Sequence, residues 1–478
     1  MSKGFRILNI NIGEVSFPIS KKVVDKIEKN FFTVIIGNNA TGKSRLLVNI
    51  LNILRQQLNP RIKVKENIFK IEYLYNNKLN YISNLNQNAP DNIDDLHLLS
   101  ISNSLFDKFP HNVKSDNNYS YVGARNQGIN THKRAIINDL MDVFNENLDD
   151  KQFLSKTKEL FNFLKIEPFI SISLRKTFGS THHRYFEFLK YSKTSESLQL
   201  YLKDLTNKGF YRQQSKILEK YSNDLDFLEN FVKFIKSNNK IFTDKSNNRL
   251  PDFFFQINLN NSDNSNEKFL TEFRFISLLR RLNLLTYESV LLKKGDFQFD
   301  IQDSSTGEIG LLMTFVRAIP ELKSNSIIFI DEPEISLHPS WQLKYIELLK
   351  KFLNGYTGCH VLIATHSHFI LSDLKENFSS VVVLNNIEGK FSVDLKEYTP
   401  FGWSPEAILY EVFGVATVRN HFFEYDLKTL LSLISNRSKD YGKINKYIDK
   451  INKFEFTTGD PLHKIIKEAK KYVQNKEK

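Results

Sequence analysis

Cysteine is almost absent from this chain of 478 residues, in which Cys359 is the single example. One cysteine excludes a disulfide within the chain and a zinc site built from several thiolates. Cys359 lies in the apolar run CHVLIATH. This context favours a buried structural thiol.

Long apolar runs are also missing. No run approaches the roughly 18 apolar residues that a membrane span requires. The start, MSKGFRILNINIG, lacks the apolar core of a signal peptide and continues as a strand. We therefore expect a folded cytoplasmic protein that does not contact a membrane.

Acidic residues are fewer than basic ones, and the net charge is +12 with a pI near 9.2. Such a balance suits a polyanionic partner such as nucleic acid. Lys, Asn, Ile and Phe are all abundant, however, as an A/T-rich genome would produce without selection for nucleic acid. Charge alone therefore leaves nucleic acid binding open. The length indicates two or three domains.

The strongest motif is GNNATGKS, Gly37 to Ser44. It follows an apolar strand and precedes an amphipathic helix, the context in which G-x-x-x-x-G-K-[ST] indicates a phosphate-binding loop. Gly37 and Gly42 allow successive N–H groups to face one anion, while Lys43 reaches the β- and γ-phosphates and the Ser44 hydroxyl ligates Mg²⁺. The predicted ATP-binding residues are Gly37, Asn38, Asn39, Ala40, Thr41, Gly42, Lys43, Ser44 and Arg45.

Strand patterns surround this loop. Leu8, Ile10 and Ile12 alternate with polar residues, while Phe5 and Ile7 sit in the opposite phase. The pattern predicts a strand there, and a second strand over 15–19. A third strand is predicted to run into a turn over 119–126. Arg125 or Gln127 could approach the nucleotide from that turn, and an exposed polar loop is the alternative.

From about 133 to 293 the apolar residues recur at helical spacing, which indicates an inserted helical domain. Its longest candidate helix covers 212–237 and lacks sustained heptads, so a long coiled-coil arm is not predicted. We expect two halves of one ATPase lobe, 1–132 and 294–399, separated by the helical domain 133–293 and followed by a helical extension, 400–478.

Two later strands end in chemically useful residues. SIIFIDE predicts a buried strand that delivers Asp331 and Glu332 to the edge where ligands bind in open α/β sheets. Asp331 there can hold Mg²⁺, and Glu332 can orient and deprotonate water. A second buried strand ends at His366, which can donate to the γ-phosphate. The alternative for Asp331 and Glu332 is that they are two acids in a surface turn, and the alternative for His366 is a structural role.

The order of phosphate loop, long insertion, SSTGE, IIFIDEPEISLHP and ATHS resembles the ATP-binding-cassette ATPases of the chromosome-maintenance (SMC), RecF-like and OLD-like class. The resemblance covers Phe5 to Leu54 and Phe297 to Leu384. It implies an α/β fold, in which a mixed sheet flanked by helices carries an inserted helical domain and a helical C-terminal extension. It also implies ATP and Mg²⁺ as ligands and a dimer that closes around ATP.

The same resemblance assigns roles to individual residues. Asp331 and Glu332 correspond to the Walker B pair, 335–339 to the D-loop, and His366 to the switch histidine. Ser304 to Glu308 correspond to the signature segment, in which Ser305 and Gly307 would meet the γ-phosphate held by a second subunit. The signature residues assigned in this way are Ser305, Thr306, Gly307 and Glu308. Thr306 stands where glycine is usual. No Q-loop glutamine can be assigned, and Gln127 is only a candidate Mg²⁺ ligand.

A narrower resemblance rests on SNSLFDKFP, YVGARN and the segment Pro400 to Leu427 together with DEPEISLHPSWQ. These strings look like ATPases of bacterial antiphage systems, especially the Septu-type ATPase that also accompanies some retrons. The ATPase of the PARIS system is a related alternative. The resemblance implies a sensor or regulatory subunit that forms homodimers or higher even oligomers. Its implied partners are an HNH nuclease and a retron reverse transcriptase with its msDNA.

Beyond Asp373 the chain contains no Asp-x-Asp, and about 100 residues remain. We therefore do not expect the built-in nuclease of OLD-type proteins. The second hypothesis is a RecF-like or SMC-like DNA repair or chromosome ATPase that binds DNA itself.

Apolar residues of the extension predict a partner-binding surface, and packing onto the ATPase lobe is the alternative. These residues are Phe401, Trp403, Ile408, Leu409, Val412, Phe413, Phe422 and Phe423.

Overall fold

The computed structural model describes residues 4–21, 27–38, 41–62, 69–84, 93, 95–104, 106–111, 116–123, 125, 133–177, 182–207, 215–238, 253–260, 266–304, 306–387, 390–397, 399–403, 407–409, 412, 421–436, 438–452 and 461–474. The chain separates into two compact units, Met1–Gly402 and Trp403–Lys478. Among the described helices, none has the length and hydropathy of a bilayer-spanning segment.

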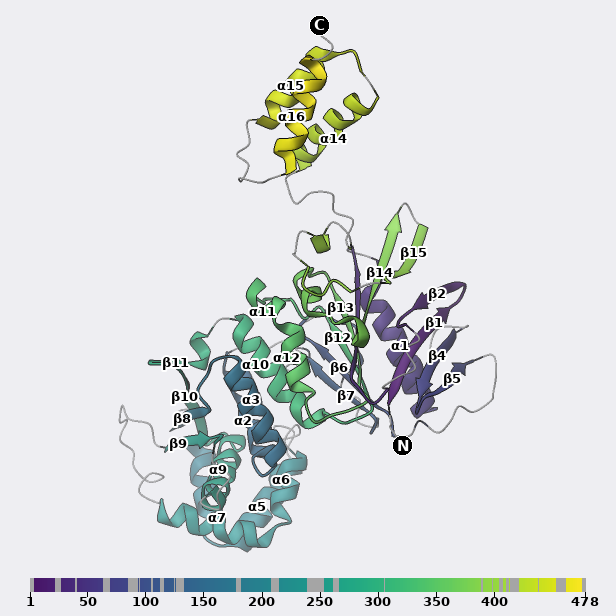
Figure 1. Ribbon diagram of the computed structural model, residues 1–478. Coiled ribbons are helices and arrows are strands. Elements are labelled where there is room, and N and C mark those ends of the chain that lie inside the picture. The colour runs from purple at the N-terminus through teal and green to yellow at the C-terminus, as the bar shows by residue number, and fades with distance from the viewer. Residues whose placement is uncertain are drawn as a thin grey trace. The chain divides into compact units, whose positions relative to one another are not determined.

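A seven-stranded sheet forms the centre of the first unit (Figure 1), with strand order β15-β14-β3-β13-β12-β6-β7. Its inner strands are parallel, and only the β14–β15 pair is antiparallel. β3, β12 and β13 are buried along their whole length, as near-continuous apolar runs in a covered parallel sheet should be. The strands are β3 (Phe31–Gly37), β6 (His97–Ser102), β7 (Tyr119–Gly123), β12 (Ser326–Asp331), β13 (His360–Thr365), β14 (Ser379–Ile387) and β15 (Lys390–Leu395).

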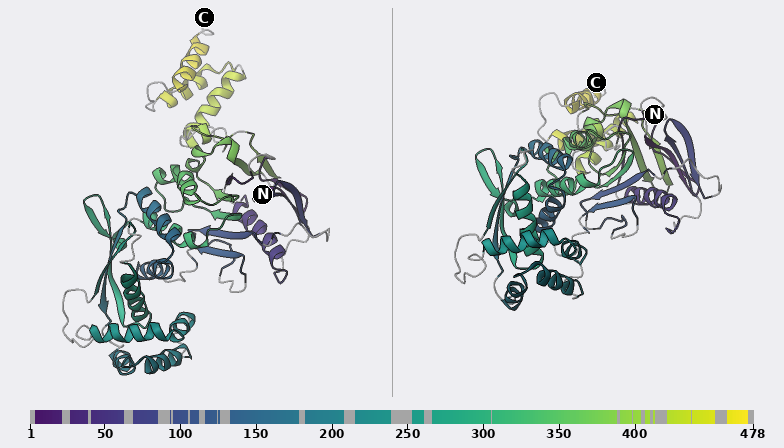
Figure 2. Two further views of the ribbon diagram at one scale, coloured as in Figure 1. Left: turned by 60° about the horizontal axis from the view of Figure 1, so that its bottom comes forward. Right: turned by 90° about the horizontal axis from the view of Figure 1, so that it is seen from below.

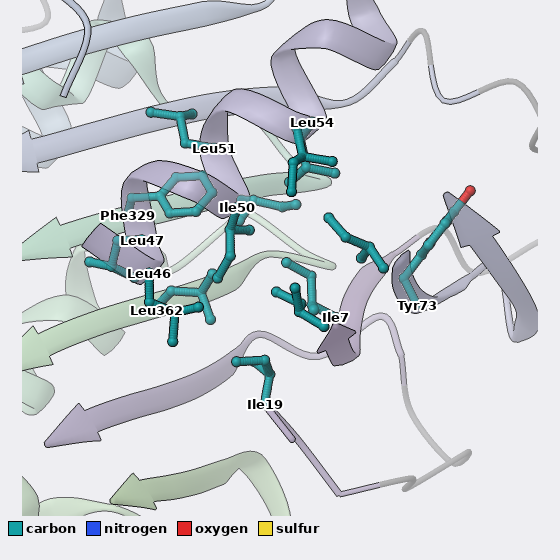
Figure 3. Close-up of a cluster of buried hydrophobic side chains, with 14 of the residues drawn as sticks. Ile7, Ile19, Leu46, Leu47, Ile50, Leu51, Leu54, Tyr73, Phe329 and Leu362 are labelled. Carbon is teal, nitrogen blue, oxygen red and sulfur yellow. The ribbon is translucent and has the colours of Figure 1, made fainter. Parts of the chain in front are cut away.

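The helix α1 (Lys43–Leu58) packs its apolar stripe into the core of this unit. Figure 3 shows its leucines among side chains of the large sheet, such as Phe329 and Leu362, and of a second sheet, such as Ile7 and Tyr73. This second sheet is antiparallel, in the order β2-β1-β4-β5. Its strands are β1 (Phe5–Ile12), β2 (Val15–Pro18), β4 (Phe69–Tyr75) and β5 (Lys78–Ser83).

The phase change noticed in the first strand has a structural cause. The register of β1 against β4 shifts between Ile7 and Asn9, as at a β-bulge. One extra residue on a strand turns the following side chains to the opposite face. Phe5 and Ile7 before the shift, and Ile10 after it, are therefore all buried in the same core.

The inserted segment is mostly helical, as expected, but it also contributes strands. β8, β9 and β10 join β11 in an antiparallel sheet of order β11-β10-β8-β9, and α2 and α9 contact β10 (Figures 1 and 2). The strands are β8 (Phe169–Lys176), β9 (Phe253–Asn258), β10 (Leu285–Lys294) and β11 (Phe297–Asp300). The helices are α2 (Lys133–Asn147), α3 (Lys151–Phe163), α4 (His182–Tyr191), α5 (Ser195–Asn207), α6 (Ser215–Ser222), α7 (Leu225–Ser237) and α9 (Asn266–Arg281).

The single helix expected over 212–237 is wrong, because α6 ends at Ser222 and α7 begins at Leu225. Asp224 separates them with extended backbone, and its side chain accepts a hydrogen bond from the Phe227 N–H. An aspartate that caps a helix in this way favours a helix start over a helix interior.

The remaining α-helices in the described part of the first unit are α10 (Thr306–Ala318), α11 (Pro339–Leu343) and α12 (Tyr345–Phe352). Short 3₁₀ helices cover Ile301–Asp303, Ile319–Glu321, Phe369–Asp373 and Glu376–Phe378. The α/β architecture with a mixed sheet flanked by helices is thus confirmed.

The second unit is helical, as expected for the extension. Its helices α14 (His421–Ser435), α15 (Tyr441–Asn452) and α16 (Pro461–Gln474) share one apolar core, which includes Phe423, Leu430 and Ile448. Three residues of the expected partner surface are withdrawn from it by burial. Ile408, Val412 and Phe423 are buried, whereas Phe401 is 51% exposed. Phe413 and the Phe422 side chain lie outside the described residues.

Candidate active site

Three adjacent strands of the seven-stranded sheet bring together residues that are far apart in the chain. β3, β13 and β12 are neighbours and run parallel, so their carboxyl ends share one edge. Gly37 ends β3, Thr365 ends β13 and Asp331 ends β12. Ligands of open α/β sheets bind at this edge. The structure therefore assembles the predicted phosphate loop, acidic pair and histidine at one place.

The phosphate loop depends on two glycines. A Cβ on Gly37 would lie 2.3 Å from the Leu384 carbonyl oxygen, and Gly42 has φ 88°, in the left-handed region. Thr41 Oγ1 donates to the Asn38 carbonyl at 2.8 Å and closes the turn. Asn39 and Ala40 lie outside the described residues, and Arg45 on α1 is exposed.

Lys43 lies beneath this loop. Its Nζ donates to the carbonyl oxygens of Gly37 at 2.8 Å and Asn38 at 3.1 Å. Burial lowers the pKa of Lys43 to about 8, although the nearby carboxylates of Glu332, Glu334 and Asp331 oppose that shift. The side chain is therefore mostly charged at neutral pH and is placed to bind phosphate oxygens.

Ser44 and Asp331 form the second part of the site. Ser44 Oγ donates a 2.9 Å hydrogen bond to Asp331 Oδ1. Burial, and to a smaller extent the charges of Glu332, Asp107 and Glu334, raise the pKa of Asp331 to about 7, while the Ser44 bond opposes the shift. A cation next to this carboxylate would favour its ionised form.

This oxygen pair fits Mg²⁺, a hard cation that takes few protein ligands and completes its shell with water and phosphate oxygens. Within the described part of the chain, no group of three or more His, Cys, Asp or Glu side chains could hold a metal ion. Water and phosphate oxygens would complete the shell of a Mg²⁺ ion held by Ser44 and Asp331. Gln127, the other candidate ligand, lies outside the described residues.

Glu332, the residue after Asp331, has an unusual backbone conformation. Its φ is 49°, and its N–H donates to the Ala364 carbonyl oxygen at 2.9 Å across to β13. A left-handed conformation in a residue other than glycine costs about 1–3 kcal/mol. The side chain is one-third exposed (33%), with Oε1 3.8 Å from His366 Nε2. Its carboxylate can therefore reach water at the edge of the site.

His366 lies between Lys43 and Glu332. Its Nδ1 is 3.3 Å from Lys43 Nζ, and an ammonium group can only donate, so Nδ1 is the acceptor and the proton of the neutral ring is on Nε2. Burial, followed by the charge of Lys43, lowers the pKa of His366, and Glu332 opposes the shift. The ring can therefore offer an Nε2–H donor to a phosphate oxygen.

Glu334 is a site residue that the sequence interpretation missed. Its carboxylate accepts hydrogen bonds from the His366 backbone N–H at 2.5 Å and from Thr365 Oγ1 at 2.8 Å. Burial is the main cause that raises its pKa. The available signal was a third acid in the string DEPE, directly after the acidic pair.

Arg125 is held by Asp107 and His111. It donates to the Asp107 carbonyl oxygen at 2.6 Å and contacts His111 Nδ1 at 2.5 Å. It therefore fixes the loop that follows β6. At the end of the same strand, Asn103 Oδ1 accepts a 2.6 Å hydrogen bond from Thr314 of α10.

The signature segment begins α10 close to the turn after β12. A Cβ on Gly307 would lie 2.3 Å from the Ser336 carbonyl oxygen, so only glycine allows this approach. Glu308 Oε1 is 3.1 Å from Lys294 Nζ. Ser305 and the Thr306 side chain lie outside the described residues.

The chain is similar to several known proteins. A protein of Vibrio cholerae serotype O1 biovar El Tor, described as "Retron Vc95 probable ATPase", is 22% identical over 433 residues, which are 83% of this chain and 77% of that protein. Among solved structures, the SMC head domain from Thermotoga maritima is 10% identical with a TM-score of 0.30, covering 83% of this chain and 100% of that one. The recombination mediator protein RecF, in the structure described as RecF-ATPrS, is 14% identical with a TM-score of 0.28, covering 82% of this chain and 99% of that one.

The family model described as "AAA ATPase domain" matches residues 14–371, more than half of the chain and all of the strands that carry the phosphate loop, the acidic pair and His366. The chain is therefore a member of the AAA ATPase domain family.

Proposed function

We propose that this ATPase hydrolyses ATP to ADP and phosphate at the shared edge of β3, β13 and β12. The observation that carries the proposal is the convergence of a phosphate-binding cation, a hydroxyl–carboxylate pair and a further carboxylate. These groups are Lys43, Ser44 with Asp331, and Glu332. They match the parts that phosphoryl transfer to water requires, namely charge stabilisation and a residue that positions the water.

Each residue has a separate task in this proposal. Lys43 binds the β- and γ-phosphate oxygens, and Ser44 and Asp331 would hold Mg²⁺, which when bound neutralises charge on the phosphates. Glu332 orients the attacking water and accepts its proton. His366 donates its Nε2–H to a γ-phosphate oxygen.

The proposed active form is a dimer. By the family resemblance, Ser305, Thr306, Gly307 and Glu308 of one chain would complete the nucleotide site of a second chain. The close approach of Gly307 to Ser336 supports this arrangement, because it places the start of α10 beside an exposed residue of the turn after β12.

The proposed biological role is that of a sensor or regulatory subunit in a bacterial antiphage system, which controls a partner nuclease of the HNH type. The relative described as a retron ATPase supports a role of this kind. ATP binding and hydrolysis by a dimer would supply the change of state that controls the nuclease.

The test is phage challenge of cells that carry this gene with its neighbouring genes. Protection should require both this gene and a neighbouring nuclease gene, and Lys43→Ala should abolish it. Lys233→Ala, which changes an exposed lysine of α7, is the matched control and should leave protection intact. Rescue of a DNA repair defect without any partner gene would instead favour a RecF-like or SMC-like role.

A further inference from the structure

We infer that Glu334 is a positioning residue that holds His366 in the orientation in which its Nε2–H faces the nucleotide. The inference rests on the proposed ATP hydrolysis and adds to it a residue with no assigned role. It is carried by two hydrogen bonds and by the way in which the turn after β12 is fixed.

Both oxygens of the Glu334 carboxylate are used at the end of β13. Oε1 accepts from the His366 backbone N–H at 2.5 Å, and Oε2 accepts from Thr365 Oγ1 at 2.8 Å. The Thr365 hydroxyl in turn accepts from the Ser367 N–H at 2.9 Å. One carboxylate thus fixes three consecutive residues around the histidine. Hydrogen bonds to an ionised acceptor are stronger than those between neutral groups.

The carboxylate can do this because its own backbone is held. The Glu334 carbonyl oxygen accepts from the Leu337 N–H at 3.0 Å, and the Glu332 carbonyl oxygen accepts from the Ile335 N–H at 3.3 Å. Ser336 adopts a left-handed φ of 63° in the same turn. The turn is therefore a fixed support that is continuous with β12.

The histidine ring needs an anchor of this kind. Its side-chain neighbours at the site are Lys43 at 3.3 Å and Glu332 at 3.8 Å. Both are groups that the proposed mechanism gives to phosphate or water, so their hold on the ring weakens when ATP binds. Glu334 binds the His366 backbone instead of its ring, and it can therefore keep the ring in place throughout turnover.

The geometry also argues against Glu334 as the residue that accepts the proton of the attacking water. Its two oxygens face the Thr365 hydroxyl and the His366 N–H, whereas Glu332 is one-third exposed at the edge of the site. Removal of Glu334 should therefore act on turnover mainly through His366, and Glu334→Gln controls for the loss of its charge near Lys43 and Asp331.

The experiment compares kcat, KM and nucleotide affinity of the full chain with those of Glu334→Ala, Glu334→Gln, His366→Ala and the double variant Glu334→Ala with His366→Ala. Misplacement of a catalytic group by about 1 Å can cost about 100-fold, so Glu334→Ala should lower kcat by about 10- to 100-fold. Nucleotide affinity should stay close to that of the wild type, because Lys43 and the loop remain.

Glu334→Gln should recover most of the lost rate. Its amide oxygen can accept the His366 N–H, and its amide nitrogen can donate to the Thr365 hydroxyl. In the double variant, loss of Glu334 should add nothing to the loss caused by His366→Ala, because the two residues act as one unit. Glu321→Ala is the matched control, since Glu321 is a partly buried glutamate that accepts a serine hydroxyl, that of Ser120, in another part of the sheet.

Multiplicative losses in the double variant would overturn the inference, as would equal rates for the Ala and Gln variants or an unchanged kcat in Glu334→Ala. A readout that does not need turnover is the imidazole ¹⁵N spectrum of histidine-labelled protein saturated with Mg²⁺ and a non-hydrolysable ATP analogue, which draws Lys43 to phosphate, with His366 assigned by His366→Ala. The wild type should show one neutral tautomer with the proton on Nε2, and Glu334→Ala should show a tautomer mixture. An unchanged spectrum contradicts the inference even if the wild type does not hydrolyse ATP, whereas that lack of hydrolysis would contradict the proposed function.

Discussion

The Ser44 hydroxyl donates a 2.9 Å hydrogen bond to the Asp331 carboxylate, although the two residues are 287 positions apart in the chain. Ser44 is the second residue of α1, and Asp331 is the last residue of β12. The bond therefore connects the phosphate loop to the acidic strand across the intervening β13. The effect of burial on the pKa of the Asp331 carboxylate can be tested here without nucleotide.

Asp331→Asn should stabilise the nucleotide-free chain above pH 7. The pKa of Asp331 is raised to about 7 in the folded protein, mainly by burial, and is about 4 in an unfolded chain. Ionisation therefore costs the folded state stability that grows from about pH 4 to pH 7 and is constant above it. Asparagine is neutral throughout, so the melting temperature of the variant should exceed that of the wild type most strongly at pH 8.

Thermal unfolding at pH 8 and pH 5, without Mg²⁺ or nucleotide, measures this difference, which should shrink at the lower pH. Asp449→Asn, at an exposed position of α15, is the control and should show no such trend. Equal melting temperatures of Asp331→Asn and the wild type at pH 8 would show that burial does not raise this pKa.

Lys43→Ala and Glu332→Gln should separate nucleotide binding from turnover. Loss of a charged hydrogen-bond donor costs about 1.5–3 kcal/mol, so Lys43→Ala should weaken ATP binding by about 10- to 100-fold. Glu332→Gln keeps the shape of the side chain but not its basicity. It should bind ATP normally and hydrolyse it about 100- to 10,000-fold more slowly.

Binding of a fluorescent ATP analogue and phosphate release, both with Mg²⁺, provide the measurements. Arg175→Ala, which removes a partly exposed arginine paired with Glu288 in the inserted segment, is the control. Hydrolysis by Glu332→Gln at the wild-type rate would exclude Glu332 as the residue that accepts the proton.

Mixed dimers should test whether two chains share each site. Ser305→Arg should damage the signature segment and leave the phosphate loop intact, whereas Lys43→Ala should do the reverse. Mixing the two proteins should restore about one working site per mixed dimer, because each chain supplies the part that the other lacks. Hydrolysis is measured before and after mixing, and native mass spectrometry confirms mixed dimers. No recovery despite proven mixed dimers would count against shared sites.

Phe401→Asp should weaken association with a partner nuclease and leave ATP hydrolysis unchanged. Phe401 is 51% exposed, with Lys375 Nζ 5.7 Å from its ring centroid. An exposed aromatic side chain of this kind often contributes to a protein interface. Co-purification of the nuclease encoded beside this gene is the measurement.

Phe297→Asp, at a 68% exposed phenylalanine of β11, is the matched control and should retain the nuclease. Equal retention of the nuclease by both variants would remove Phe401 from the interface. Robust Mg²⁺-dependent DNA cleavage by the isolated chain would contradict the proposed division of labour.

Structural features formed by residues close together in the chain could be predicted from the sequence. The phosphate loop needs two glycines, a lysine and a hydroxyl between a strand and a helix, and all of these lie within a few positions of one another. Asp331, Glu332 and His366 could be predicted for the same reason, since each directly follows or ends a buried apolar strand.

The inserted sheet shows where local patterns were insufficient. β8 pairs with β9 and with β10, which join it from more than 75 positions further along the chain. Ile and Ser alternate in FISISLRK, but helical spacing in the surrounding segments masked this short signal. Strand pairing between distant segments is decided by packing, which a local pattern does not contain.

The sequence by itself determined which chemical groups this protein has, because motif residues and their immediate flanks specify the loop, the strands and the family. Only the tertiary structure decided how these groups meet. The parallel order β3, β13, β12 brings Ser44 to Asp331, and the left-handed turn at Glu332 directs Glu334 back to the His366 N–H. Those contacts depend on sheet order and backbone direction, which arise from burial of the whole core and not from any single stretch of residues.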